Sequence, residues 1–401
     1  MNVVYYWNLH SPPHGLNGAI KIINELDPDM IWYAHRVTGI PMPPDINSAY
    51  DIAKNCGLSE KKAKEFQQWC KQQAYTLEHV KEQVDAVKDK IYCPCILGYS
   101  NFRIDFNFDP ITFECIDRDT MWNEMLLNFG KWGIVNPRTG KPYTVRETQE
   151  LFWRRGLPRH NGIPDFSNPL VQEYYIKKAQ AMRDCGAKAV WFDMFFQLPQ
   201  RLMDLLNLDY NHPMIRDLYM GCVKIMNTAK FLGLTVGTWI NALMFPYNVD
   251  LYVDFYNASP TTQEVKTNTI NKRRWKTFAD LVKTKATNRH AWLLIMFDFG
   301  ARCDLPLPTF ACKSVPEQNE FLIKLYMLSN DLRDYGIEAN VAYPIHGPGL
   351  CERPCKRAWG RYDYYDALAP EFFTYPTIKA ILTKRLLIKA VTGNKPIKVK
   401  I

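Results

Sequence analysis

The chain has 401 residues, of which 47% are hydrophobic and 23% charged, so it can bury a large core in one or two domains. Its formal net charge is +9, but the basic residues are scattered, and the two denser clusters lie at 271–276 and 384–400. Such basic runs are usually solvated helix faces, so nucleic acid is not the expected partner. No stretch approaches the roughly 20 apolar residues of a membrane-spanning helix, so we expect no membrane span.

Apart from Asn2, the first seven residues are apolar or aromatic, and they lack the basic region that opens a signal peptide. We interpret them as a first strand and expect a cytoplasmic protein. The eleven cysteines contain no doubled C-x-x-C pattern, so we expect no structural metal, and buried free thiols are the simplest interpretation. Disulfides are the alternative for a thermophile source, because intracellular proteins of hyperthermophiles form them.

Strand-like runs and helices alternate along the chain. The first three expected strands cover 3–8, 30–34 and 91–99, with helical segments at 16–26 and 46–90 between them. A long insertion, about 101–160, follows the third strand. In an alternating fold it emerges at the carboxyl ends of the strands, where such folds keep their sites.

The segment that follows carries the clearest local signals. Asn168 can cap a helix that has Pro169 at its first position, and Gly186 ends that helix. The apolar run 189–192 then predicts a buried strand that stops at Asp193. A carboxylate at the end of a buried strand is how α/β enzymes present catalytic acids.

The second half continues the alternation. The expected strands cover 235–240, 251–255, 291–297 and 338–343, and the expected helices cover 213–232, 262–284, 315–335 and a last segment from Thr374. Ser314 and Glu317 form a capping-box pattern before the third of these helices. The link 242–250 between two of the strands is shorter than the dozen residues that a parallel crossover needs.

Eight strand-like runs alternating with helices predict a (β/α)8 TIM barrel. We expect one barrel domain over 1–401, with an elaborated helical region after strand two and an inserted subdomain, about 101–160, over the carboxyl-end face. An open doubly wound sheet is the alternative, but no Gly-rich phosphate loop follows the first strand.

Polar and aromatic side chains stand at or beside the expected strand ends, which a barrel would bring to one rim. The candidate catalytic carboxylates are Asp193, Asp254 and Asp298. The candidate substrate-binding residues are Trp7, Asn8, His35, Trp191, Trp239, Asn241, Asn257 and His346. Carboxylates ringed by aromatics suit a glycosidase, in which one carboxylate protonates the leaving oxygen and another attacks or activates water. No cofactor is expected, and the oligomeric state is not predicted.

His10 and His14 are four residues apart, a spacing that on a helix pairs two metal ligands. They follow a strand through two prolines, so helical spacing does not apply and we expect no metal there.

Residues 165–174, Asp-Phe-Ser-Asn-Pro-Leu-Val-Gln-Glu-Tyr, and 186–193, Gly-Ala-Lys-Ala-Val-Trp-Phe-Asp, resemble a signature of barrel glycoside hydrolases. In the α-amylase-like and α-galactosidase-like groups, a D-x-x-N-P-x-V stretch precedes the third helix, and a G-x-D-G-[VIF]-x-x-D strand delivers the catalytic Asp. The resemblance implies a barrel that acts on a glycosidic bond, with Asp193 as nucleophile or base.

The sequence departs from that signature at several positions. Lys188 replaces the first Asp of the strand motif, and Asn241 stands where an α-amylase-like enzyme has its acid Glu. An α-galactosidase-like arrangement implies Asp254 as the acid, and Asp298 matches the third carboxylate of the α-amylase-like set. Glu264 is a further candidate for the acid.

Two functions follow from this pattern. The first is a glycoside hydrolase-like enzyme with a carboxylate pair at the barrel rim. The alternative is a non-catalytic carbohydrate-binding barrel that has lost its acid, which the amide at Asn241 favours. A nucleic-acid-associated protein using the basic clusters is the third and weakest hypothesis.

Overall fold

The computed structural model describes residues 1–37, 48–99, 125–127, 129–153, 163–299, 304–347 and 365–383. Eight parallel strands pair in sequence order, and β1 also pairs with β8, so the sheet closes into a barrel. The parallel strands are β1 Val3–Tyr6, β2 Met30–Val37, β3 Ile91–Leu97, β4 Ala189–Asp193, β5 Thr235–Trp239, β6 Phe255–Ala258, β7 Trp292–Ile295 and β8 Ala339–Gly347.

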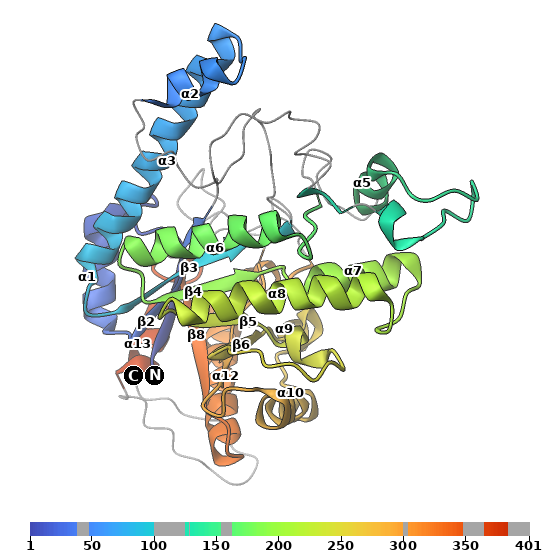
Figure 1. The fold of residues 1–401 in the computed structure, drawn as a ribbon. Helices are drawn as coiled ribbons and strands as arrows, with labels where there is room; N and C mark the ends of the chain where they lie inside the picture. The colour runs from blue at the N-terminus through green and yellow to red at the C-terminus, as the bar shows by residue number, and fades with distance from the viewer. Residues whose placement is uncertain are drawn as a thin grey trace. The chain divides into compact units, whose positions relative to one another are not determined.

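Helices connect the successive strands, so the predicted (β/α)8 TIM barrel is confirmed (Figure 1). The pairing of Val3 with Ala342 and of Val4 with Tyr343 closes the barrel and excludes the open doubly wound sheet. A short ninth strand, β9 Tyr365–Asp366, pairs antiparallel with the end of β8.

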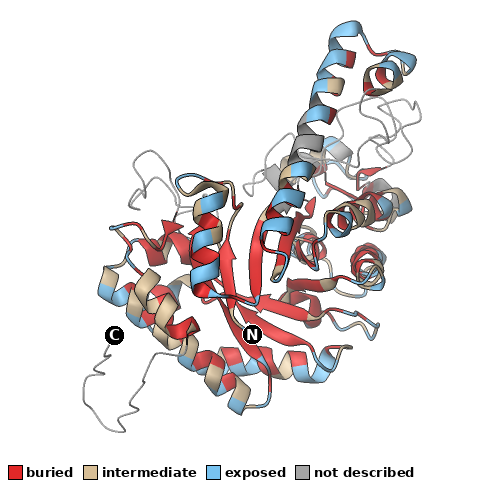
Figure 2. Cartoon of the chain, turned by 90° about the vertical axis from the view of Figure 1, so that its left-hand side faces the viewer, coloured by how far each residue is buried: buried red, intermediate tan, exposed pale blue. Residues whose placement is uncertain are grey.

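The chain forms two compact units, each built from separate segments. One unit comprises 1–35, 86–93 and 254–401, and the other comprises 36–85 and 94–253. The strands of both are buried on both faces, while the helices expose one side, as Figure 2 shows by colour. Near-continuous apolar strands are what a parallel sheet covered by helices requires.

One helix of the first unit begins with the predicted capping box. The helices of this unit are α1 Gly15–Leu26, α9 Thr262–Thr267, α10 Lys272–Lys285, α11 Pro306–Ala311, α12 Val315–Asp334 and α13 Tyr375–Leu382. Ser314 and Glu317 cap α12 reciprocally, as predicted. The single helix predicted over 262–284 is two helices, because Asn268 adopts a left-handed conformation with φ 53° and ends α9.

The second unit contains α2 Ala49–Asn55, α3 Glu60–Ala86, η3 Phe129–Trp132, α5 Val145–Trp153, α6 Pro169–Asp184, α7 Gln197–Leu206, α8 Pro213–Phe231 and η4 Ile240–Met244. Asn168 caps α6 as predicted, since its side-chain oxygen accepts a hydrogen bond from the Leu170 N–H at 2.9 Å. The sequence pattern did not predict α7. The cap of α8 is His212, whose ring accepts from the Met214 N–H.

The predicted bounds of the sixth strand are wrong. The strand begins at Phe255, where the sequence pattern placed its end. Leu251 and Val253 are buried and Tyr252 is exposed, and this alternation made the segment resemble a strand. The link from β5 therefore spans 240–254 and contains η4, which is long enough for a parallel crossover.

Within the predicted insertion, the structure describes 125–127 and 129–153, where η3 and α5 lie; residues 101–124 lie outside the described ranges. Among the described cysteines, six are free and Cys56 is disulfide-bonded. No helix in the described ranges is both long enough and apolar enough to cross a bilayer.

Candidate active site

Asp193 is the last residue of β4, as predicted. The next residue, Met194, has a φ of 62°, a left-handed conformation that is uncommon for a residue with a side chain. Gly98 lies against this turn, and its N–H donates to the Asp193 carbonyl at 2.8 Å. A Cβ on Gly98 would lie 3.0 Å from the carbonyl oxygens of Asp193 and Met194, so glycine permits the close approach.

The Asp193 carboxylate is oriented by Trp239. The indole N–H donates to Asp193 Oδ1 at 2.7 Å, and the Trp239 ring lies 6.0 Å from that of Trp191. Trp191 is fully buried, whereas Asp193 and Trp239 are half-buried. A partly accessible carboxylate with a fixed orientation can attack or accept a proton, and the adjacent indole surface can pack against a flat sugar face.

Tyr99 and Arg201 complete the surroundings of Asp193. Burial raises the pKa of Tyr99 to about 12, with a smaller raising effect from the Asp193 charge, while the charge and hydrogen bond of Arg201 act in the opposite direction. The phenol is therefore neutral near pH 7 and can donate a hydrogen bond. Arg201 belongs to α7, the helix absent from the sequence-based expectation.

Asn241 lies in η4, just after β5. It is buried, and its amide Nδ2 donates to Gln200 Oε1 at 3.1 Å. An amide has no titratable proton near neutral pH, so this residue can orient a polar group but cannot act as a general acid.

Asp254 does not lie at the carboxyl end of a strand. It directly precedes β6, its carbonyl accepts from the Trp292 N–H at the start of β7, and its carboxylate accepts from Asn288 Nδ2 at 3.0 Å. The positional argument for a catalytic role therefore fails for this residue. The error follows from the misplaced strand.

Asp298 follows β7, at the carboxyl end of its strand. Its backbone N–H donates to Ser259 Oγ at 2.9 Å, and its Oδ1 accepts from the Phe299 N–H at 2.9 Å. Asp254 and Asp298 therefore lie at opposite ends of the paired strands β6 and β7.

Glu264 is occupied by structural contacts. It is buried, closes the capping box of α9 with Thr261, and accepts from Arg274 and from the Trp275 indole. It is therefore not available as the acid. Asn257 lies inside β6 and is fully buried.

The first unit gathers three predicted residues near the end of β1. The Trp7 N–H donates to the His346 carbonyl at 2.9 Å, which continues the pairing of β1 with β8. Asn8 adopts a φ of 50° and accepts from the His10 N–H through its side chain. His35 lies within β2 and is half-buried.

His346 belongs to a cluster that the sequence did not predict. Its Nδ1 lies 2.8 Å from Asp366 Oδ2, and His14 Nε2 lies 2.7 Å from the same oxygen. Burial alone would raise the pKa of Asp366, but the hydrogen bonds and charges of the two histidines outweigh it and lower that pKa. Asp366 is therefore an ionised, fully buried carboxylate. It is 352 residues from His14, so no local pattern could reveal the contact.

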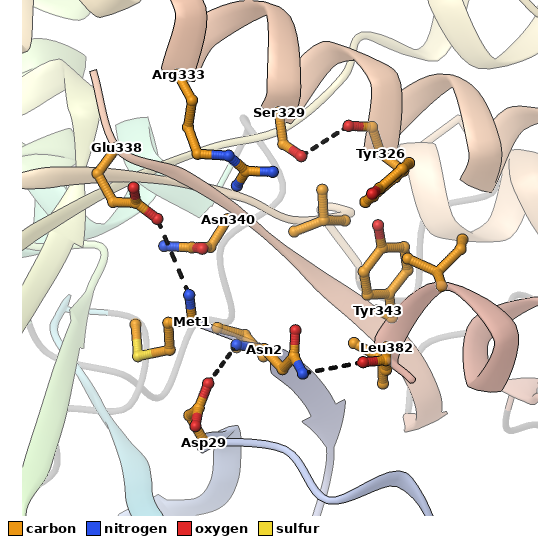
Figure 3. A pocket seen from close by; sticks show the side chains of 13 residues that line it. Met1, Asn2, Asp29, Tyr326, Ser329, Arg333, Glu338, Asn340, Tyr343 and Leu382 are labelled. Carbon is orange, nitrogen blue, oxygen red and sulfur yellow. Dashed lines mark hydrogen bonds and ion pairs between the residues drawn. The ribbon is translucent and has the colours of Figure 1, made fainter. Parts of the chain in front are cut away.

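A cavity of about 560 Å³ lies at the other end of the first unit's strands (Figure 3). Met1, Asn2 and Val3 line it at the start of β1, and Glu338 and Asn340 line it at the start of β8. Figure 3 shows the Met1 amino group paired with Glu338, 3.9 Å away, and Asn340 beside this pair. Because barrel enzymes keep their chemistry at the carboxyl ends, this cavity is not the candidate active site.

No protein-family model matches the chain, and no curated protein matches it either. Solved structures similar to it include a variant of the glycoside hydrolase domain of PelA from Pseudomonas aeruginosa (11% identity, 85% of this chain and 94% of that chain covered, TM-score 0.39). A GH20 exo-β-N-acetylglucosaminidase from Vibrio harveyi has 10% identity and a TM-score of 0.36, with 76% of this chain and 41% of that chain covered. A cyclic α-maltosyl-(1→6)-maltose hydrolase from Arthrobacter globiformis has 11% identity and a TM-score of 0.45, with 96% and 83% covered. The TM-scores are below 0.5, so the assignment of the barrel rests on its strand order.

Proposed function

We propose that the chain is a glycoside hydrolase-like enzyme that acts on a glycosidic bond and uses Asp193 as nucleophile or base. The observation that carries the proposal is the Asp193 carboxylate at the end of β4, held by the Trp239 indole at 2.7 Å beside a second indole ring. The residues around Asp193 also resemble the barrel hydrolase signature in sequence, apart from Lys188 and Ala189. The ligand is accordingly a carbohydrate.

The proposed second carboxylate is Asp298, because it follows β7 at the carboxyl end of its strand. Asp254, which an α-galactosidase-like arrangement implies as the acid, precedes β6 and accepts a hydrogen bond from Asn288. On this proposal Asp298→Asn lowers turnover, whereas Asp254→Asn leaves it near that of the wild type.

The decisive variant is Asp193→Asn. The asparagine carbonyl can still accept the Trp239 hydrogen bond, so the fold is expected to be retained while the charge is lost. We expect kcat/KM on a responsive substrate, found by screening aryl glycosides and oligosaccharides, to fall at least about 100-fold. The matched control is Asp204→Asn, an exposed carboxylate on α7. Undiminished turnover by the folded Asp193→Asn variant would remove Asp193 from the mechanism.

The second candidate function is a carbohydrate-binding barrel without catalysis. The buried amide of Asn241, in the position where the resemblance implies an acid, favours it. It predicts that the wild-type chain binds oligosaccharides on a glycan array and releases no product from any ligand it binds. Product formation that depends on Asp193 excludes this alternative.

A further inference from the structure

The cluster of His14, His346 and Asp366 brings three metal-ligating side chains together at the carboxyl end of β1 and β8. Asp366 is carried by β9, which pairs directly with the end of β8, so that His346 and Asp366 are register partners. The ligating atoms of the three residues all lie within 4.8 Å of one another. They come from positions that only the closed strand order brings together.

A further hydrogen bond orients the Asp366 carboxylate. The second oxygen of Asp366, Oδ1, accepts from the Leu368 N–H at 2.9 Å. Carboxylates that bind metals are commonly oriented by such additional hydrogen bonds. His14 occupies the cap position of α1 but makes no capping hydrogen bond with its side chain, which instead points to Asp366.

We propose that His14, His346 and Asp366 form a binding site for a divalent transition metal, with Zn²⁺ as the reference ion. Two imidazole nitrogens and one carboxylate oxygen are a common donor set for zinc when three protein ligands leave one position open. The site contains neither of the proposed catalytic carboxylates, Asp193 and Asp298, and it does not depend on the proposed function.

The geometry needs a small adjustment to accept the ion. Zinc lies about 2.0–2.2 Å from nitrogen and oxygen ligands, so ligand atoms around it are roughly 3.3 Å apart. The nitrogen-to-oxygen distances are 2.7 and 2.8 Å, so each ring moves outward by about 0.5 Å. A neutral imidazole also moves its proton to the other ring nitrogen, which leaves a lone pair facing the metal.

Solvent can reach the proposed metal site at His14, and the Tyr6 hydroxyl is a further polar group beside it. His346 and Asp366 are fully buried, whereas the His14 side chain retains 12% exposure. The hydroxyl of Tyr6 is buried and has no hydrogen-bond partner within the described ranges, and its ring lies 5.3 Å from the ring of His346. Burial and the Asp366 charge raise the pKa of Tyr6, so the phenol keeps its proton and can donate a hydrogen bond.

The test measures metal binding directly, without an activity assay. The full chain, stripped of metal with a chelator, is titrated with Zn²⁺ in a calorimeter. His14→Gln removes the most accessible ligand nitrogen but keeps an amide that can donate to Asp366, and we expect it to weaken Zn²⁺ binding by more than about 10-fold. The matched control is His290→Gln, which removes an exposed histidine and should leave binding unchanged.

Co²⁺ gives a second measurement, which uses the wild-type chain and therefore remains informative if the His14→Gln variant misfolds. Bound to the wild-type chain at this site, Co²⁺ should give visible ligand-field absorption without the near-ultraviolet band of a thiolate ligand. One Zn²⁺ per chain together with this spectrum supports the site. A thiolate band, absence of Zn²⁺ binding by the wild type, or equal affinity of His14→Gln and wild type overturns it, and the cluster is then a hydrogen-bond network only.

Discussion

Two aspartates lie at different ends of their strands and make different hydrogen bonds. Asp193 ends β4 and accepts a hydrogen bond from the Trp239 indole N–H, whereas Asp254 precedes β6 and accepts one from the Asn288 side-chain amide. A hydrogen bond to a charged group contributes about 1.5–3 kcal/mol, which is enough to fix the orientation of a half-buried carboxylate. Only the first of these two aspartates is held at the end of the barrel where chemistry is expected.

Lys178 is a buried amine on α6, and the effect of its burial on the free energy of unfolding can be measured. Its amine lies 4.4 Å from the ring centre of Tyr174, and burial lowers its pKa from 10.5 to about 7. Between pH 7 and 10 the unfolded chain therefore binds a proton that the folded chain does not, so the free energy of unfolding rises with pH. Below pH 7 both states are protonated and this contribution is constant.

We expect Lys178→Met to increase the free energy of unfolding at pH 7, because a methionine fills similar space without a buried charge. The gain over the wild type should shrink as the pH rises toward 10. Urea unfolding at several pH values measures both effects. Lys177→Met, at the neighbouring and less buried position, is the control. An equal gain at pH 7 and pH 10 would contradict the assigned cause.

At the scale of elements, α6 and α8 lie side by side in Figure 1, and a glycine allows a close contact near the start of α6. A Cβ on Gly221 of α8 would lie 1.8 Å from the carbonyl oxygen of Phe166. That oxygen also accepts from Gln172 Nε2 at 3.0 Å, so it cannot move away without breaking a buried hydrogen bond. The contact therefore depends on the missing side chain.

Gly221→Ala should destabilise the protein although alanine is the better helix former. The gain in helix propensity is about 1 kcal/mol. The clash with a fixed backbone is expected to exceed it and to leave a net loss of about 2 kcal/mol in the free energy of unfolding. Lys224→Ala, on the exposed side of α8, should change stability by less than about 0.5 kcal/mol. A stabilised Gly221→Ala variant would show that α8 and the backbone at Phe166 can move apart easily.

At the scale of the whole molecule, the pairing of β1 with β8 closes the barrel. The seam is tight at Gly347, where a Cβ would lie 2.5 Å from the ring of Tyr5. The ring of Tyr5 stacks on Phe299 at 5.3 Å and meets Trp32 edge-on at 5.4 Å, so it has little space to yield.

Gly347→Ala should therefore lower the free energy of unfolding by about 1–3 kcal/mol, the usual cost of an overpacked core. Chemical denaturation provides the measurement. Tyr5→Leu removes the ring, so in that background the cost of Gly347→Ala should be clearly smaller. Equal costs in the two backgrounds would mean that the ring is not the cause.

The sequence by itself determined the features whose signals lie within a few residues. The cap at Asn168, the capping box of Ser314 and Glu317, and the strand that ends at Asp193 were predictable because a cap or a buried run is a local preference. The number of strands and their alternation with helices were sufficient to predict the barrel.

Only the tertiary structure decided which strands meet and where each one begins. The closure of β1 on β8, the start of β6 at Phe255, and the contacts of Trp239 with Asp193 and of His14 with Asp366 join residues far apart in sequence. Such contacts depend on how strands pair and pack, and neighbouring residues carry no signal for them. For this reason the sequence placed Asp193 correctly at the end of β4 but placed Asp254 at the wrong end of its strand. It did not predict the His14, His346 and Asp366 cluster.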